Sequence, residues 1–255
     1  MKNKTLNYFN SNSYERSYIL SAKRILIVLI SFILFYCSEK KNYNKTKFEI
    51  TYPEKFSENG YDGRLLLMIS NNNNAEPRFQ INDSHHTQII FGIDVESWKS
   101  GETQIFDSNV YGYPIKSIGN LKEGEYYVQA FLHKYETFNL STGYKVKLPK
   151  DQGEGQKWNI SPKNLYSTPK KVKISKSGTI KLSLENEISP IEPIKDSKYI
   201  KHVKIKSEML SKFWGRDMFL QANVLVPHNF NKNSKVKYPL MIFHGHFPNT
   251  FRGFR

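Results

Sequence analysis

The sequence predicts a mainly β protein, with a β-sandwich over residues 48–187 and a region of different pattern over residues 201–255. Aromatic residues make up 14% of the 255 residues, and Ala is scarce, which favours strands over helices. Short apolar or alternating runs recur along the chain, separated by turn signals at Ser100-Gly101, Gly119-Asn120 and Ser177-Gly178. Short strands punctuated in this way are typical of sandwiches.

The first 36 residues are expected to be an export signal. Lys23 and Arg24 precede an apolar run over residues 25–36, which is short of the roughly 20 residues of a membrane span and fits a secretory signal. Cys37 follows directly, and this placement resembles bacterial lipoprotein signals, in which the cysteine is lipidated. We therefore expect an exported lipoprotein at a bacterial outer membrane or cell surface. The alternative is a signal-anchored or secreted protein with an inert Cys37.

Residues 37–47 are expected to form a disordered tether, because residues 40–47 are polar apart from Tyr43 and show no apolar periodicity. The chain carries a formal net charge of +15, but the basic residues are scattered, whereas a nucleic-acid footprint is clustered. We expect no nucleic-acid partner, and attraction to an anionic membrane surface fits the charge better. The single cysteine excludes a disulfide framework and a cysteine-rich zinc site.

The predicted sandwich begins with the alternating residues 47–53 and continues through "GRLLLMISN" at residues 63–71, which contains a continuous apolar run. Its most diagnostic piece is "IGNLKEGEYYVQAF" at residues 118–131, where a Gly turn leads into a Tyr-rich strand, as in immunoglobulin-like modules. Further strands are expected within residues 87–95, 170–175 and 179–185. Such a module binds, spaces or packs, and by itself implies no chemistry.

A glycine-rich loop interrupts this pattern at residues 151–156. Asp151 and Glu154 could form an oxygen-rich cation loop, but an EF-hand needs more carboxylates, and no Gly-Lys-Ser/Thr follows as in a phosphate-binding loop. We expect an ordered insertion that packs through Trp158, and cation binding stays open.

A linker is predicted over residues 188–200, where Pro190 and Pro193 favour an extended connector. Residues 201–210 then alternate as a strand, a turn follows at Trp214-Gly215, and a second strand over residues 218–226 ends at Pro227. A third strand-like run, Leu240 to Phe243, leads into His244-Gly245-His246.

This succession resembles the opening of α/β-hydrolase domains of the esterase D and feruloyl-esterase type. Residues from Phe48 onward, including "AEPRFQI", "DQGEGQ", "FWGRDM" and "HGHFP", are similar to the N-terminal part of secreted, esterase-like bacterial proteins with a β-sandwich before the hydrolase domain. The resemblance implies that backbone amides around Gly245, His246 and Phe247 form one side of an oxyanion hole for ester hydrolysis.

The remaining catalytic parts are not found in the sequence. No Gly-x-Ser-x-Gly motif occurs, so no catalytic residue is assigned, and His244 and His246 lack further ligands for a metal. No cofactor is expected. We expect a truncated hydrolase domain over residues 201–255, in an esterase fragment that is inert alone and takes an ester substrate only when completed.

The alternative is an exported β-sandwich binding module, in which exposed aromatics such as Trp98 and Trp158 stack on sugars. The substrate and the oligomeric state stay open.

Overall fold

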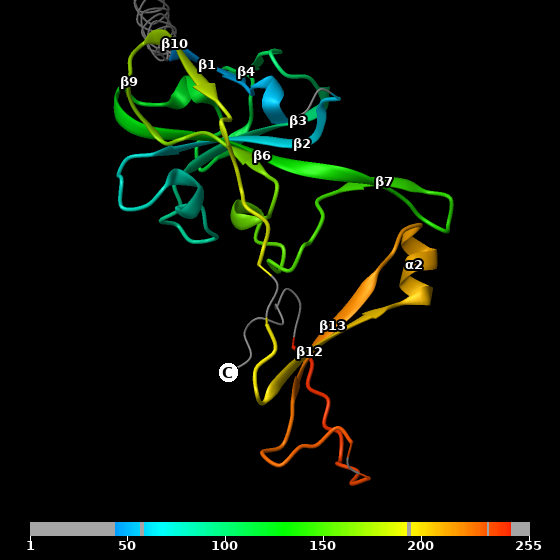
Figure 1. Cartoon of the computed structure of the whole chain (residues 1–255). Coiled ribbons are helices and arrows are strands. Elements are labelled where there is room, and N and C mark those ends of the chain that lie inside the picture. The colour runs from blue at the N-terminus through cyan, green and yellow to red at the C-terminus, as the bar shows by residue number, and fades with distance from the viewer. Residues whose placement is uncertain (1–43, 57–58, 193–194, 234, 246–255) are drawn as a thin grey trace, which may run out of the picture. The chain divides into compact units, whose positions relative to one another are not determined.

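The structure is a computed structural model that describes residues 44–56, 59–192, 195–233 and 235–245 (Figure 1). It is mainly β with several antiparallel sheets, as the sequence predicts. The strands before the linker are β1 (Lys45–Thr51), β2 (Tyr61–Ser70), β3 (Ile89–Trp98), β4 (Gln104–Phe106), β5 (Gly112–Tyr113), β6 (Gly124–Asn139), β7 (Lys145–Leu148), β8 (Leu165–Tyr166), β9 (Lys170–Ile174), β10 (Ser177–Ser183) and β11 (Asn186–Glu187). Four single-turn 3₁₀ helices lie between them: η1 (Glu54–Phe56), η2 (Pro77–Phe79), η3 (Ile118–Asn120) and η4 (Trp158–Ile160).

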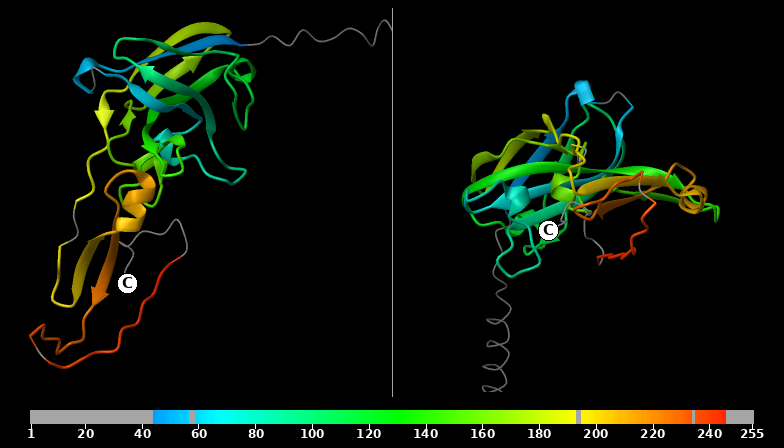
Figure 2. Two further views of the ribbon diagram at one scale, coloured as in Figure 1. Left: turned by 90° about the vertical axis from the view of Figure 1, so that its right-hand side faces the viewer. Right: turned by 60° about the horizontal axis from the view of Figure 1, so that its bottom comes forward.

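These strands form two sheets. The smaller sheet has the order β10-β1-β4, and β1 pairs in parallel with β10, from Lys45↔Ser177 to Thr51↔Ser183, and antiparallel with β4. The larger sheet has the order β11-β8-β6-β2-β3-β5, and β7 and β9 also pair with β6. The long strand β6 thus pairs with four strands, β2, β7, β8 and β9, and forms the spine of the larger sheet (Figure 1 and Figure 2).

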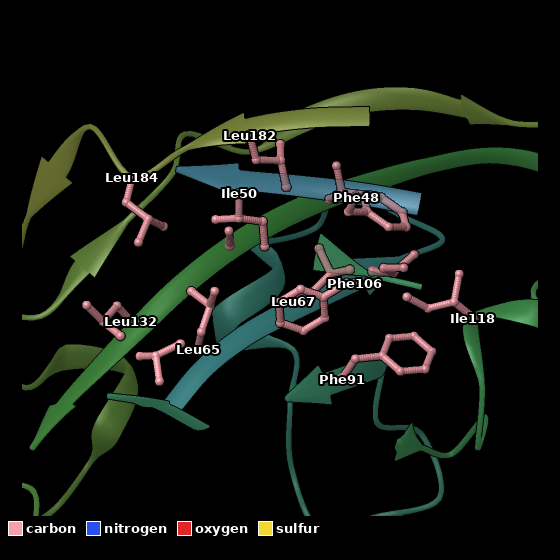
Figure 3. Close-up of a cluster of buried hydrophobic side chains, with 14 of the residues drawn as sticks. Phe48, Ile50, Leu65, Leu67, Phe91, Phe106, Ile118, Leu132, Leu182 and Leu184 are labelled. Atoms are coloured by element: carbon pink, nitrogen blue, oxygen red, sulfur yellow. The ribbon is translucent and has the colours of Figure 1, made fainter. Parts of the chain in front are cut away.

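The main core lies between the two sheets, and period-two alternation places its residues there. Phe48 and Ile50 of β1 point toward Leu65 and Leu67 of β2 and Leu132 of β6 (Figure 3). Each fully buried side chain of this kind stabilises the fold by about 1.5–3 kcal/mol. Other members of the cluster are Tyr52, Ile69, Phe91, Val95, Trp98, Phe106, Ile118, Leu121, Val128, Ala130, Leu165, Ile174, Leu182 and Leu184.

The opposite face of the larger sheet is also covered at its centre. Met68 and Phe131 alternate with the core residues on β2 and β6 and are nevertheless fully buried. The Phe131 ring meets Trp158 of η4 edge to face, with the ring centroids 5.2 Å apart. Burial on both faces explains why the sequence over β2 is a continuous apolar run and does not alternate.

The first strand begins earlier than the sequence pattern predicts. Strand β1 starts at Lys45, inside the predicted tether, and the polar residues Asn44 and Thr46 are buried. The Asn44 amide donates to the Gly119 carbonyl at 2.8 Å, and the Asn44 Oδ1 atom accepts from the Thr46 amide at 2.7 Å. These bonds compensate the burial of polar groups that the sequence alone marks as solvent-exposed. Residues 1–43, with the predicted signal and Cys37, lie outside the described residues.

A two-stranded antiparallel sheet follows the linker. Strands β12 (Ile200–Lys206) and β13 (Phe219–Leu225) pair from Ile200↔Leu225 to Lys206↔Phe219, as the two predicted strands require. A short helix, α2 (Glu208–Trp214), connects them where the sequence pattern predicts only the end of a strand and a turn. The Ser207 hydroxyl caps its first turn by accepting from the Leu210 amide, and Gly215 ends it in the left-handed conformation. No helix among the described residues is long and apolar enough to cross a bilayer.

Candidate functional site

The predicted oxyanion-hole segment does not form an organised site in the described residues. Gly245 and His244 are exposed and lie in irregular backbone, and His246 and Phe247 lie outside the described residues. The strand predicted at Leu240 to Phe243 is absent, and these four side chains are 79–90% exposed. A strand needs a neighbour to accept its backbone hydrogen bonds, and no described strand pairs with this run.

The "FWGRDM" segment makes the contacts between the β12–α2–β13 unit and strand β6. The Trp214 ring packs against Phe138 with centroids 5.4 Å apart, and the Arg216 Nη1 atom lies 2.6 Å from Glu136 Oε2. The Phe213 carbonyl accepts from the Ser141 amide at 2.8 Å. This motif of the esterase resemblance therefore has a structural role in the described chain.

The "AEPRFQI" segment forms a buried polar cluster with β6. We call it the Arg78 network: Glu76, Arg78, Gln129, Asn159 and Ser167. The Arg78 guanidinium pairs with Glu76 (Nε to Oε2, 2.9 Å) and donates to the Asn159 carbonyl at 3.1 Å. Gln129 is fully buried, accepts from the Arg78 amide at 3.1 Å, and donates to Glu76 and to the Ser167 carbonyl.

Two aromatic rings complete the surroundings of Arg78. The guanidinium carbon lies 4.1 Å from the ring centre of Tyr166 and 4.5 Å from that of Phe79. The network thus fastens the loop before η2 and the loop around η4 to the same strand. The Arg78 guanidinium has a structural role, because little of its surface remains exposed to contact a ligand.

The Asp151–Glu154 loop is held by its own carboxylates. The Gly153 amide donates to Asp151 Oδ1 at 2.8 Å, and the Gln152 amide donates to Glu154 Oε2 at 2.8 Å. Trp158 packs on Phe131, as expected for an ordered insertion. Within the described ranges, no group of three or more His, Cys, Asp or Glu side chains is placed to hold a metal ion.

The expectation that Trp98 is an exposed sugar-stacking residue is wrong. Its side chain is 1% exposed and meets Tyr52 edge to face, with centroids 4.8 Å apart. The indole Nε1 donates to the Glu102 carbonyl at 2.9 Å, which satisfies its polar atom inside the core. Burial raises the pKa of Tyr52 to about 12. Large aromatic residues in alternating strands face either layer, and composition alone does not say which.

Strand β6 also carries two titratable residues whose pKa values are shifted by burial. Desolvation lowers the pKa of His133 to about 4 and that of Lys134 to about 8. The Lys134 ammonium lies 4.1 Å from the ring centre of Tyr61 and 3.5 Å from Glu187 Oε2, and the nearby carboxylate partly offsets the desolvation. The Lys134 ammonium is paired with this carboxylate, and the His133 ring packs near Tyr135 with ring centroids 5.7 Å apart, so both residues are part of the packing.

No catalytic pair is assembled in the described part of the chain. His202 Nδ1 lies 3.2 Å from Asp196 Oδ1, a His–carboxylate contact that the sequence pattern did not single out. Among the described residues, however, no serine or cysteine side chain forms a hydrogen bond with a histidine ring, so this contact activates no nucleophile.

A polar depression of about 480 Å³ lies where β1 begins. It is lined by Asn44, Lys45, Thr46, Asp107, Ser108 and Ser117.

Comparisons with known protein families, with curated proteins and with solved structures find no match in any of the three. The resemblance to esterases therefore rests on the sequence motifs quoted above.

Proposed function

We propose that this chain is the N-terminal part of an exported, esterase-like protein in which an immunoglobulin-like β-sandwich precedes an α/β-hydrolase domain. The chain by itself is catalytically inert. Two facing sheets with a shared apolar core, built mainly from antiparallel strands, support the sandwich. The antiparallel pair β12–β13, followed by an apolar run and His-Gly, supports the hydrolase opening.

The observation that carries the proposal is the unburied apolar surface after the linker. Ile205, Leu220 and Leu225 of the β12–β13 pair are 56–60% exposed, and Leu240 to Phe243 are 79–90% exposed. In an α/β-hydrolase such residues are covered by neighbouring strands and by helices on the sheet faces. This exposed apolar surface is more typical of the first strands of a larger sheet than of a surface that faces solvent.

The test compares this polypeptide with one extended past Arg255 by the downstream coding sequence, in whichever frame supplies Gly-x-Ser-x-Gly. The polypeptide of 255 residues is expected to show no labelling by a fluorophosphonate probe and no turnover of p-nitrophenyl acetate above a heat-denatured control. Loss of a serine nucleophile or its histidine costs on the order of 10⁶ in kcat in a triad enzyme.

The extended protein is expected to gain probe labelling and hydrolysis of acetyl or feruloyl esters, both abolished by replacing the serine of the new motif. A folded extended protein without activity on these esters, or the absence of the motif in every downstream frame, would contradict the esterase assignment.

Export and anchoring belong to the same proposal, supported by the apolar run over residues 25–36 and the cysteine that follows it. Labelling with a palmitate analogue is expected for the wild-type chain and not for Cys37→Ser. Equal labelling of both would show that Cys37 is not the lipidated residue.

A second candidate function is a binding module, and the exposed pair Tyr111 and Tyr113 favours it. Their side chains are 66% and 57% exposed at the edge strand β5. Exposed tyrosines offer flat, amphipathic surfaces for stacking on sugar rings. This candidate predicts retention on an immobilised polysaccharide that is lost in Tyr111→Ala and kept in Tyr144→Ala, since Tyr144 is also exposed, at 72%, but lies on another loop.

A further inference from the structure

Four exposed lysines lie at the end of the two-layer domain where β1 begins. We call this end the β1 pole. Lys45 is the first residue of β1, and its amide donates to the Lys176 carbonyl at 2.7 Å. Lys122 follows Leu121, whose carbonyl accepts from the Asn44 side chain at 3.4 Å. Lys116 precedes Ser117, which lines the polar depression together with Lys45.

The lysines of the β1 pole have no ion-pair partner among the described residues. The acidic residues nearby are Asp107, which accepts from the Asn109 amide at 2.8 Å, and Glu123. At the far ends of β2 and β6 the situation differs, because Lys147 contacts both Asp62 and Glu96, and Lys150 contacts Glu136. The β1 pole therefore carries a net positive charge, because its four lysines outnumber these two carboxylates.

Along the sequence, this pole follows shortly after the most apolar segment of the chain. The apolar run over residues 25–36 and Cys37 precede Asn44 by only a few residues. The seven residues from Cys37 to Asn44 span at most about 24 Å when fully extended. An anchor at or before Cys37 thus keeps the β1 pole within a short distance of the bilayer. Attraction between lysines and anionic lipid acts over roughly one Debye length, about 8 Å at physiological salt.

We propose that the β1 pole docks on the surface of an anionic phospholipid bilayer through Lys45, Lys116, Lys122 and Lys176, with the polar depression facing the lipid headgroups. The proposal rests on the membrane attachment proposed above, because the anchor supplies the local concentration that a small basic patch needs. Docking sets the orientation of the domain. Because β10 runs parallel to β1, the chain leaves this sheet at the end opposite the β1 pole, and that end then faces away from the bilayer.

The experiment measures lysine acetylation in the full chain bound to vesicles of phosphatidylcholine with about 30% phosphatidylglycerol, and to vesicles of phosphatidylcholine alone. The four lysines are expected to be protected on the anionic vesicles only, and to regain reactivity in high salt. Binding is compared for a variant with Lys→Gln at positions 45, 116, 122 and 176. The matched control has the same change at Lys99, Lys145, Lys157 and Lys195, which are exposed and lie elsewhere.

Each lysine close to an anionic surface contributes about fivefold in affinity, so the variant at the pole is expected to bind at least about tenfold more weakly, and the control within about twofold of wild type. Equal loss in both variants would overturn the proposal, as would four lysines that stay fully reactive on anionic vesicles. Protection by millimolar inorganic phosphate without vesicles would also overturn it, in favour of a free-anion site. Failure of the proposed membrane anchor gives a different result from failure of the docking, because without the anchor the whole chain dissociates from both kinds of vesicle.

Discussion

Gln129 is a fully buried amide in the middle of β6, and its three hydrogen bonds connect two loops to the larger sheet. Buried polar groups of this kind are costly when a partner is lost, because the remaining donors and acceptors stay desolvated. In the sequence, Gln129 interrupts an apolar strand, which marks the position as unusual. Its partners at Glu76 and Ser167 could not be predicted, since they are brought to it by two loops far apart in the sequence.

Replacing Arg78 with Met tests the Arg78 network. We expect a loss of roughly 2–3 kcal/mol in the free energy of unfolding, because Glu76 and the Asn159 carbonyl lose a partly buried partner. The matched control is Arg64→Met, which removes an ion pair with Asp94 that is largely open to solvent and is expected to change stability by less than about 1 kcal/mol. Urea denaturation measures both, and equal effects would show that the network adds no stability.

His133 gives the protein a predicted pH dependence. Its pKa is lowered to about 4 by burial, so between pH 6.5 and 4 the unfolded chain binds a proton that the folded chain does not. Stability is therefore expected to fall as the pH decreases through this window, by roughly 2 kcal/mol after allowance for partial exposure. In His133→Gln this part of the slope should disappear, whereas His85→Gln, at an exposed turn, should keep it. Denaturation curves at several pH values check the difference.

At the scale of elements, the alternating pattern predicted strands well and the short helix poorly. Strands β1, β2, β3, β6, β9, β10, β12 and β13 overlap the predicted runs, although several of them begin or end outside the predicted bounds. The helix α2 is only seven residues long, too short for a clear helical period, and its markers are the Ser207 cap and Gly215. The run at Leu240 to Phe243 has strand composition, but composition does not supply the neighbouring strand that pairing requires.

Gly215 lies at the contact between α2 and the end of β6. Its φ is +65°, and a Cβ there would lie 2.6 Å from the Asn139 carbonyl oxygen. We expect Gly215→Ala to weaken the contact through this clash, in addition to the ~1 kcal/mol cost of a left-handed Ala. The Ser141 amide, which donates to the Phe213 carbonyl, should then exchange with solvent faster.

Gly143→Ala is the matched control for this prediction. Gly143 has φ +87°, but an added Cβ meets nothing within 4 Å. Gly143→Ala should lower the free energy of unfolding only by the cost of a left-handed Ala, and the Ser141 amide should stay protected from exchange. Unchanged exchange at Ser141 in Gly215→Ala would mean that the contact tolerates the added methyl group.

For the whole molecule, the structure revises where an independently folding unit must begin. A polypeptide of residues 44–188 is expected to unfold cooperatively, because both sheets and the shared core lie within it. A version starting at residue 48 loses the first three pairs of β1 with β10 and the buried Asn44 and Thr46, and should unfold at lower urea concentration. Calorimetry and circular dichroism test both, and a non-cooperative transition for residues 44–188 would show that the unit needs the rest of the chain.

The sequence thus predicted a mainly β protein and most of its strands, because these depend on local periodicity and turn chemistry. It did not predict which aromatic residues face the core, since Trp98 and Trp158 look alike in the sequence and differ in burial. The candidate site was predicted from a resemblance, and of its three residues only Gly245 lies within the described ranges.

The parallel pairing of β1 with β10 has a mechanical consequence. Residues before 44 attach at the start of β1, whereas the chain toward the linker leaves from the end of β10, so tension between the two attachment points pulls these strands in opposite directions along their length. All seven residue pairs then bear load together in shear and do not open one after another like a zipper. A domain of this topology resists force between an anchored end and whatever its other end carries.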